Sequence, residues 1–277
     1  MKKINYSSAN TILGIIVSIF SFVVFSLTVE PTASYWDCAE YISTSAKLQV
    51  GHPPGAPLFQ MLGAIFSTFA FESDQIALSI NMMSVTSSAL TILFLFWSIS
   101  HLIKPLVTTE KSISIIEAIR IFGSSTLGSL TFTFTDSFWF NAVEAEVYAM
   151  ATLILSILFW LGLKWTDEFE KNRPDKWLIL ISFVSGLSFG VHFMGLLAIP
   201  SIVLIYFFRK RENFSYSNLN KIINPYLLFS LSTLILFVFT FFGEDIFFFP
   251  LAVLAFLLTV FYIKRKNVID KLWDKYF

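Results

Sequence analysis

The stretch that decides the fold is Thr11–Val29, which reads TILGIIVSIFSFVVFSLTV and contains no charged residue. A helix of about 20 apolar residues is long enough to cross the hydrocarbon core of a bilayer. Lys2 and Lys3 precede the run, which ends in Val29-Glu30-Pro31 rather than in the small residues of a signal-peptide cleavage site. The pattern therefore predicts a retained signal anchor whose N-terminus lies in the cytoplasm.

The composition of the whole chain agrees with a membrane protein. Of its 277 residues, 56% are hydrophobic and 14% are charged, whereas an ordinary soluble domain has about 25% charged residues. The 33 phenylalanines occur in blocks such as Phe247–Phe249. Lys plus Arg equals Asp plus Glu, and Cys38 is the single cysteine, so nothing indicates nucleic-acid binding or an intramolecular disulfide. These features exclude a soluble enzyme, a disordered regulator and a nucleic-acid binder.

The apolar runs along the chain predict eight transmembrane spans, including Thr11–Val29. The others are Ile76–Ser100, Ile119–Thr135, Tyr148–Trp165, Trp177–Phe189, Phe193–Phe208, Pro225–Phe242 and Ile246–Ile263. Leu58–Phe71 is apolar too, but its 14 residues favour a re-entrant or interfacial helix. If that segment does not cross, Lys47 is the only one of the 19 Lys and Arg residues outside the cytoplasm, which fits the positive-inside rule. If it crossed, this asymmetry would be lost.

The sequence therefore predicts an all-α, polytopic membrane protein of about eight transmembrane helices, plus a surface or re-entrant helix in the first extracytoplasmic loop. Both termini lie in the cytoplasm, and residues 1–277 form one integral membrane domain. The zero net charge hides a segregation, because many acids lie outside against a single lysine. These acids are Glu30, Asp37, Glu40, Glu72, Asp74, Asp136, Glu144, Glu146, Glu244 and Asp245. We expect the chemistry on this acidic face.

The first outer loop carries two neighbouring carboxylates. Residues Ser34–Leu48 have the pattern of an amphipathic helix lying along the membrane surface, with Ser34 or Thr32 as its N-cap. Asp37 and Glu40 are three residues apart, so both carboxylates would project from one face. Such a pair can provide a general base or hold a hard divalent cation. The alternative is that the two acids only favour the positive end of the helix dipole.

Two histidines are expected on the same side of the membrane. The prolines and glycines of Gly51-His52-Pro53-Pro54-Gly55 predict a rigid turn before a helix that Pro57 can begin. This turn would hold His52 at the membrane interface, although a merely solvated histidine is the alternative. His192 lies at the tip of a short helical hairpin, at a depth where an ionisable residue is a functional candidate. A hydrogen-bonded structural histidine is the alternative there.

The second polar outer loop reads TDSFWFNAVEAEVY from Thr135 to Tyr148. Glu144 and Glu146 are two residues apart and cannot share a helix face, so one would face the first loop while the other faces solvent or caps the next helix. Trp139 and Tyr148 are typical of the aromatic belt at the interface, with stacking on a sugar ring as the alternative. Motifs of phosphate-binding loops, zinc proteases and serine hydrolases are absent from the sequence.

Three blocks of the sequence resemble a known family. They are PTASYWDCAEYI (Pro31–Ile42) with LQVGHPPGAPLF (Leu48–Phe59), the block Thr135–Tyr148, and GLSFGVHFMG (Gly186–Gly195). In their length and order these blocks resemble the domain-of-unknown-function 2723 family of bacterial membrane proteins. They also resemble the eukaryotic transmembrane O-mannosyltransferases that act on IPT domains. The family-like core covers about residues 10–210.

The resemblance implies a C-type glycosyltransferase fold in the bacterial inner membrane. It implies transfer of a sugar from a polyprenyl-phosphate donor to Ser or Thr of an extracytoplasmic acceptor protein, with inversion of the anomeric carbon. Mannose is the first candidate for this sugar. Asp37 would be the general base, and Glu40 would tune it or orient the acceptor. The residues expected to bind the substrates are Lys47, His52, Asp136, Glu144, Glu146, Tyr148 and His192. No cofactor and no dedicated metal ligand are expected, although the acids would allow a divalent cation.

Two other hypotheses stay open at this point. A non-catalytic transporter or scaffold subunit could bind a lipid-linked intermediate, although the predicted spans carry no Asp, Glu, Lys or Arg near their centres. An incomplete fragment could lack the longer C-terminal part of the family, since residues 211–277 supply only two further helices and a cytoplasmic tail. A separately encoded C-terminal partner would then complete the protein.

Overall fold

The computed structural model of the chain describes residues 3–53, 55–169 and 175–209. The chain divides into two compact units, Met1–Arg209 and Lys210–Phe277. The predicted spans Pro225–Phe242 and Ile246–Ile263, and the tail after them, lie outside the described residues. The described part is a set of helices with a two-stranded antiparallel sheet, in which β1 (Ile4–Asn5) pairs with β2 (Ser112–Ile113).

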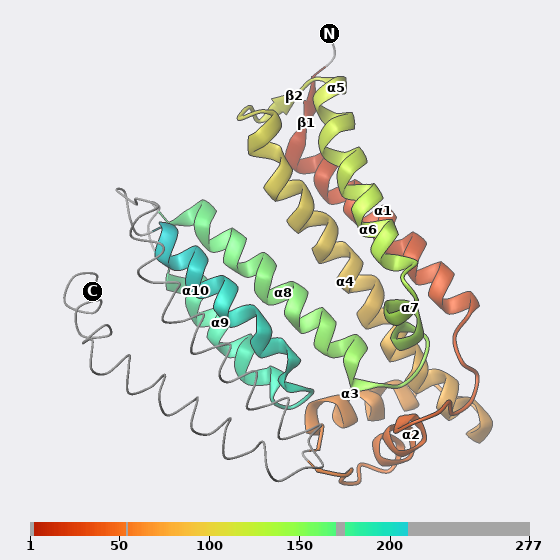
Figure 1. Cartoon of the computed structure of the whole chain (residues 1–277). Helices are drawn as coiled ribbons and strands as arrows, with labels where there is room; N and C mark the ends of the chain where they lie inside the picture. The colour runs from red at the N-terminus through yellow and green to blue at the C-terminus, as the bar shows by residue number, and fades with distance from the viewer. Residues whose placement is uncertain (1–2, 54, 170–174, 210–277) are drawn as a thin grey trace, which may run out of the picture. The chain divides into compact units, whose positions relative to one another are not determined.

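Three helices of the described part are long and apolar enough to cross a membrane. They are α1 (Tyr6–Leu27), α4 (Ile76–Val107, preceded by a 3-10 turn at Ser73–Gln75) and α8 (Val147–Glu168). Helix α4 packs against both α1 and α8 (Figure 1). The prediction of a helical membrane protein is thereby confirmed, and the number of eight spans stays a prediction.

Small and hydroxyl-bearing residues set the contacts between these helices. The Ser18 hydroxyl of α1 donates to the Ala89 carbonyl of α4 at 2.7 Å. Gly14 leaves room for the indole of Trp97, which a Cβ at position 14 would meet at 2.5 Å. Lipid chains are as apolar as the helices themselves, so close packing and interhelical hydrogen bonds replace hydrophobic burial as the source of association.

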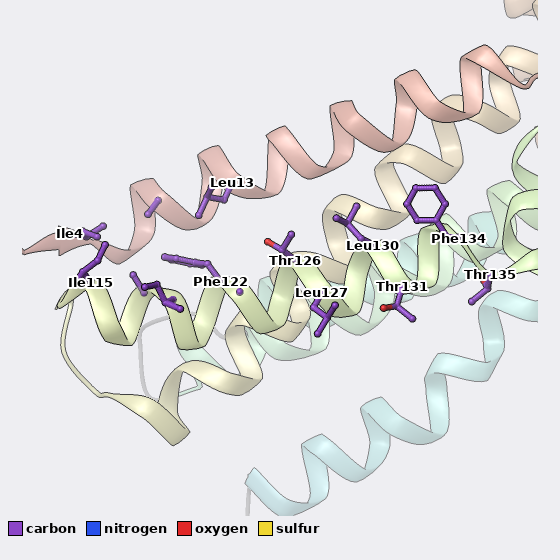
Figure 2. Close-up of a pocket in the computed structure, with 14 residues that line it drawn as sticks. Ile4, Leu13, Ile115, Phe122, Thr126, Leu127, Leu130, Thr131, Phe134 and Thr135 are labelled. Atoms are coloured by element: carbon purple, nitrogen blue, oxygen red, sulfur yellow. The ribbon is translucent and has the colours of Figure 1, made fainter.

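The predicted span Ile119–Thr135 is a π-helical turn (Ile119–Gly123) followed by α6 (Ser124–Thr133), and α5 (Ile115–Ala118) directly precedes them. An apolar groove of about 1020 Å³ runs between these pieces and α1 (Figure 2). Leu13, Phe122 and Phe134 are among the side chains that line it. The groove has the character of a lipid-facing surface and offers no titratable side chain for chemistry.

Three short helices lie where α1 ends and where α4 and α8 begin (Figure 1): α2 (Cys38–Ala46), α3 (Pro57–Ser67) and α7 (Asp136–Ala142). Proline at the first position begins α3, as the sequence predicts, because its fixed φ and missing N–H suit that position. With 11 residues, α3 is too short to span a bilayer, in agreement with the non-crossing assignment of this segment.

The predicted hairpin Trp177–Phe189 and Phe193–Phe208 forms α9 (Asp175–Ser188), a 3-10 turn (Phe193–Leu197) and α10 (Ala198–Arg209). Its tip lies against the start of α3, because the Gly190 carbonyl accepts a hydrogen bond from the Leu58 N–H at 2.7 Å. This contact connects the hairpin to the helix that follows the His52 turn.

We expect Gly190→Ala to lower the thermal unfolding midpoint of the purified protein. A Cβ at position 190 would lie 2.8 Å from the Leu58 Cβ and 3.3 Å from the Leu187 carbonyl oxygen, and overpacking of this kind costs about 1–3 kcal/mol. Gly186→Ala is the matched control, since a Cβ in that helical position meets nothing within 4 Å and alanine favours the helix. Equal midpoints for the two variants would contradict the contact between α3 and the hairpin tip.

Candidate active site

The two polar loops of the sequence meet in space. The first polar loop (residues 28–56) joins α1 to α3, and the second polar loop (residues 134–146) joins α6 to α8. The Glu30 N–H donates to the Val143 carbonyl at 2.9 Å, and the Ser34 hydroxyl donates to the Glu144 carboxylate. Glu144 is 3% exposed and therefore faces the first loop, as one of the two glutamates was expected to do.

Asn81 of α4 anchors the first polar loop through hydrogen bonds to its backbone. Its side chain is fully buried, and its Nδ2 donates to the carbonyls of Glu30 and Thr32 at 2.6 and 2.8 Å. The Cys38 thiol lies 3.9 Å from the Asn81 Oδ1. Asn81 is not among the site residues predicted from the sequence, where its signal is a single asparagine inside the apolar run Ile76–Ser100.

Helix α2 is shorter than the predicted Ser34–Leu48, and both N-cap predictions are wrong. Trp36 has a φ of 60°, which reverses the chain, so that the helix begins only after Asp37. Ser34 instead contacts Glu144, and the Thr32 hydroxyl donates to the Glu30 carboxylate at 2.7 Å. The Asp37 carboxylate stands at the N-cap position of α2 without capping it.

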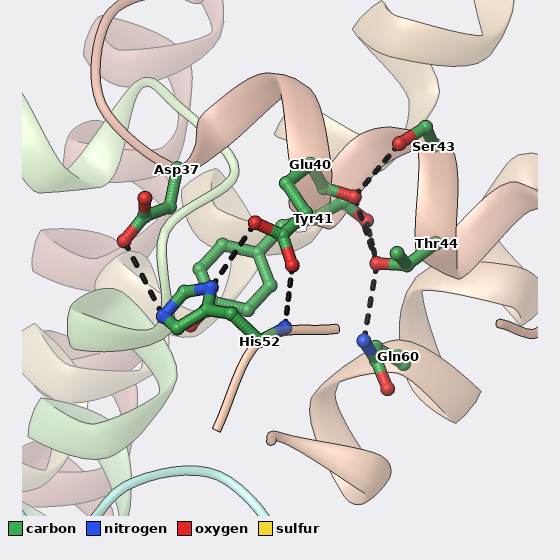
Figure 3. A network of polar contacts seen from close by, with 7 residues as sticks. All are labelled: Asp37, Glu40, Tyr41, Ser43, Thr44, His52 and Gln60. Atoms are coloured by element: carbon green, nitrogen blue, oxygen red, sulfur yellow. Dashed lines mark hydrogen bonds and ion pairs between the residues drawn. The ribbon is translucent and has the colours of Figure 1, made fainter. Parts of the chain in front are cut away.

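Asp37, Glu40 and His52 form a cluster at the start of α2 (Figure 3). One Glu40 oxygen accepts the backbone N–H of His52 at 2.6 Å, and the other lies 3.1 Å from the His52 Nδ1. The His52 Nε2 lies 3.7 Å from an Asp37 carboxylate oxygen. Glu40 is thus fully engaged with His52, whereas Asp37 has a half-exposed carboxylate and a single long ion-pair contact.

Gly51 allows the loop to bring His52 back onto α2. A Cβ at position 51 would lie 2.8 Å from the Gln60 amide and 3.1 Å from the Glu40 carboxylate. Gln60 also hydrogen-bonds the Thr44 hydroxyl at 3.1 Å, which ties α3 to α2. The predicted turn after His52 is present, since the Gly55 N–H donates to the His52 carbonyl at 2.8 Å.

The electrostatics of the cluster follow from these bonds. The pKa of Glu40 is lowered, chiefly by the hydrogen bond from the backbone N–H of His52. The pKa of His52 is raised, chiefly by its side-chain hydrogen bond to Glu40. An anionic Glu40 and a cationic imidazole are therefore favoured beside Asp37. The cation stands next to the one carboxylate of the cluster that is open to a substrate.

Glu146 is a buried carboxylate next to Asp37. It is 5% exposed, its Oε1 has no hydrogen-bond partner, and it precedes α8 at the N-cap position. Burial raises its pKa to about 7, with repulsion from Asp37 and Glu144 adding to the rise and the backbone N–H groups of Asp37 and Val147 opposing it. Glu146 stands at the N-cap position of α8 but makes no side-chain cap hydrogen bond, and neither glutamate of this pair faces solvent.

Tyr41 fills the space between these acids. It lies one helical turn after Asp37, is 8% exposed, and packs its ring 6.0 Å from the His52 ring and 5.2 Å from the Phe59 ring. Burial, with the charges of Glu146 and Asp37, raises the pKa of Tyr41 to about 12. The tyrosine therefore stays neutral. The four-residue spacing from Asp37 was the signal that would have included it among the predicted site residues.

The remaining predicted site residues fall in two groups. His192 and Tyr148 are neighbours, with ring centroids 5.3 Å apart. Burial lowers the pKa of His192, and its Nδ1 accepts the Met194 N–H at 3.1 Å, so the ring is neutral with a proton on Nε2. Asp136 begins α7 and Lys47 follows α2; both are exposed, and no contact found in the described residues joins either to the Asp37 cluster.

The cluster has the donor set of a divalent cation site. One ligand atom each from Asp37, Glu40 and His52 lie within 4.8 Å of one another. Carboxylate oxygens with an imidazole suit a first-row divalent ion. His52 also forms ion pairs with Asp37 and Glu40. The geometry therefore allows the cluster to act with a bound metal ion or without one.

Comparison with known proteins places this site within a family. A family model described as the protein O-mannosyl-transferase TMEM260 N-terminal domain matches residues 37–215, from Asp37 to beyond His192. Protein O-mannosyl-transferase tmem260 of Dictyostelium discoideum is 26% identical over 204 residues, which cover 69% of this chain and 23% of that protein. Protein O-mannosyl-transferase TMEM260 of Mus musculus is 26% identical over 177 residues, covering 62% of this chain and 22% of the mouse protein.

The matched region is a limited part of those relatives. This chain spans about a quarter of the length of the curated relatives that it matches. No solved structure matches the chain. The resemblance that the sequence blocks predict is confirmed, and the match includes the first polar loop from Asp37 onward, the whole second polar loop and the hairpin that carries His192.

Proposed function

The chain belongs to the protein O-mannosyl-transferase TMEM260 family, and from this premise we propose that it transfers mannose to Ser or Thr of a protein. The donor in this proposal is a polyprenyl-phosphate mannose in the inner membrane of a bacterium. The reaction takes place on the extracytoplasmic side and inverts the anomeric carbon. The observation that carries the proposal is the Asp37 carboxylate, half-exposed beside an ion-paired Glu40 and His52.

Asp37 is the general base of this reaction. Of the three clustered groups it is the carboxylate free to approach a substrate, because Glu40 already accepts two hydrogen bonds from His52. The acceptor hydroxyl oxygen attacks the anomeric carbon of mannose and loses its proton to Asp37. The bond from that carbon to the phosphate oxygen breaks, and the polyprenyl phosphate leaves with the electron pair of the broken bond. General-base catalysis of this kind contributes about 10²–10⁴-fold.

The cationic and neutral donors among the predicted substrate-binding residues suit the departing phosphate. The imidazolium of His52 supplies positive charge next to the reacting groups, and Glu40 fixes its orientation. His192 offers its Nε2–H as a hydrogen-bond donor, and Lys47 offers an exposed ammonium group. Charge-assisted donors placed where negative charge develops stabilise the transition state.

Glu146 and Tyr41 complete the acceptor side of the site. The unpartnered Oε1 of Glu146 is buried next to Asp37 and can accept a hydrogen bond from a substrate hydroxyl. A buried polar atom left without a partner is costly, so substrate binding would compensate for it. Glu144 supports the wall of the site through Ser34, and the ring of Tyr148 packs at a tilt against that of His192.

The test is a transfer assay with the full chain. Purified protein, and membranes containing it, are incubated with polyprenyl-phosphate mannose and an acceptor protein, and Ser and Thr are examined for added hexose by mass spectrometry. We expect transfer, and we expect it to continue in EDTA because His52 already pairs with both carboxylates and offsets part of their charge. Loss of transfer in EDTA with recovery in Mn²⁺ would instead assign a metal to Asp37, Glu40 and His52.

The comparison of purified protein with membranes tests the partner hypothesis. Transfer by membranes but not by the purified chain would indicate a second polypeptide that completes the enzyme. Binding of the lipid donor without transfer in either preparation, with a range of polyprenyl-phosphate sugars, would contradict the proposal and favour a transporter or scaffold subunit. Transfer of a different hexose would retain the reaction and correct the sugar.

A further inference from the structure

A second pocket, of about 520 Å³, is lined by residues from the beginning of α1 and from the ends of α4 and α8. These helix ends lie at the end of the bundle opposite to α2 and α3 (Figure 1). Lys104 and His101 of α4 and Lys164 of α8 line the pocket. None of these residues belongs to the proposed active site. The pocket is therefore a separate feature that mannosyl transfer does not explain.

The two lysines of this pocket are held in place by aromatic rings. The Lys104 Nζ lies 4.9 Å from the centroid of the Tyr6 ring, and the Lys164 Nζ lies 5.4 Å from that of Trp160. A cation over an aromatic face is attracted to it and loses part of its freedom. Both ammonium groups are thus partly ordered at the pocket before any ligand binds.

The charges around the pocket leave a positive surplus. Asp167 lies 3.5 Å from the His101 Nε2 and 3.7 Å from the Lys164 Nζ, so its charge is shared between them. No ion pair joins Lys104 to an acid in the part of the chain that the structure describes. Two lysines against one aspartate leave a formal surplus of one positive charge with histidine neutral.

The aromatic wall of the pocket is typical of the head-group region of a membrane. Trp97 and Trp160 line the pocket, and Phe94 packs against both of them, with the three ring centroids 5.3–5.7 Å apart. Trp and Tyr gather at the membrane interface, where one part of the ring is apolar and the other is wet. The Trp97 Nε1–H already donates to the Asn10 carbonyl at 3.2 Å, and the two lysines are the charged donors that line the pocket together with His101.

We propose that this pocket binds the anionic phosphate group of a membrane lipid between α1, α4 and α8. Basic pockets between membrane helices bind lipid head groups, and the aromatic wall provides the apolar surface on which the glycerol and the first acyl carbons would lie. A free phosphate compound offers the same anionic chemistry, so the experiment separates the two sources.

The test uses the full chain, purified in detergent and stripped of lipid. Dioleoyl phosphatidylglycerol, dioleoyl phosphatidylcholine and sn-glycerol 3-phosphate are added separately, and binding is followed by native mass spectrometry and by the thermal unfolding midpoint. We expect phosphatidylglycerol to bind and to raise the midpoint, with phosphatidylcholine at least about fivefold weaker. Each of Lys104→Gln and Lys164→Gln should weaken phosphatidylglycerol binding roughly fivefold.

Two controls keep the result specific to the pocket. Lys176→Gln removes the same charge from an exposed lysine that pairs with Glu168 outside the pocket, and it should leave binding unchanged. The doubly substituted Lys104→Arg and Lys164→Arg protein should retain binding. Equally tight sn-glycerol 3-phosphate binding that needs both lysines would support the site and identify a soluble phosphate as its ligand. Equal binding of both lipids, unaffected by either lysine substitution, would overturn the proposal.

Discussion

Asp37→Asn is expected to reduce the initial rate of mannosyl transfer by about a thousandfold, within the range that a general base contributes. Asparagine has nearly the same shape as aspartate, but its amide cannot take the proton of the acceptor hydroxyl. The Asp37 side chain is half-exposed and makes a single long contact to His52, so the substitution should leave the fold intact. Initial rates of hexose addition at saturating donor, with the unfolding midpoint as a check, measure the effect.

Asp74→Asn is the matched control for this variant. Asp74 is an exposed acid in the 3-10 turn between α3 and α4, and it makes no contact with the Asp37 cluster among the described residues. The same change of charge at this position should leave the rate within a few-fold of the wild type. A fully active Asp37→Asn protein, together with an inactive Glu40→Gln protein, would transfer the role of base to Glu40.

The spans of this protein could be predicted because they depend on local composition. The apolar stretches around α1, α4 and α8 appear in the sequence as runs long enough for a bilayer, and the structure places helices there. α1 begins five residues before its predicted start and α4 ends seven residues after its predicted end, whereas both ends of α8 lie within three residues of the prediction. The apolar segment Leu58–Phe71 has only 14 residues, which correctly indicated a helix too short to cross a bilayer. Neither result needs knowledge of which helices touch.

The beginning of α2 could not be predicted, because it depends on a single backbone angle. Amphipathic periodicity extends back to Ser34. The positive φ of Trp36 interrupts it, so α2 begins only after Asp37. A bulky residue in this region is uncommon and is held there by its surroundings. Here the surroundings include the bond from Ser34 to Glu144. That partner is 110 residues away in the chain, so no local pattern reports it.

The composition of the candidate site was predictable, but its arrangement was not. The spacing of Asp37 and Glu40 indicated that the two side chains would be neighbours, and the turn around His52 was visible in its prolines and glycines. The convergence of His52 on both carboxylates requires the tight passage of Gly51 across Glu40, which is a tertiary contact. For Asp136 the local sequence and the tertiary structure point in different directions. The acidic loop around it suggested a place in the site, but Asp136 begins α7 and the structure gives this role no support.

Glu146→Gln should lose activity and gain stability at the same time. Its folded-state pKa of about 7 lies above the ordinary value of 4.5, so the folded protein binds this proton more tightly than the unfolded chain does. The stability contributed by the neutral form is therefore complete below about pH 4.5 and is lost as the pH rises through 7. The cost of the charged form above pH 7 is roughly 3 kcal/mol, at about 1.4 kcal/mol for each pH unit.

Glutamine removes this cost because it cannot ionise. Its oxygen can still face the backbone N–H groups of Asp37 and Val147, so the shape of the site is retained. We expect the unfolding midpoint of Glu146→Gln to exceed that of the wild type by several degrees at pH 8, and the difference to disappear near pH 4.5. Glu144→Gln is the variant with which Glu146→Gln is compared. Burial also raises the pKa of Glu144, but the hydrogen bond from the Ser34 hydroxyl opposes that rise.

The same substitution should reduce transfer about a hundredfold, because a neutral amide is a weaker acceptor for a substrate hydroxyl than a carboxylate. Wild-type transfer should then rise with pH around 7, as Glu146 ionises, over the interval in which the folded protein becomes less stable. This opposition is expected of a residue kept for function at the expense of stability. A Glu146→Gln protein that is stabilised at pH 8 but fully active would make Glu146 a structural carboxyl group. A protein that is less stable than the wild type at every pH would contradict the burial on which both expectations rest.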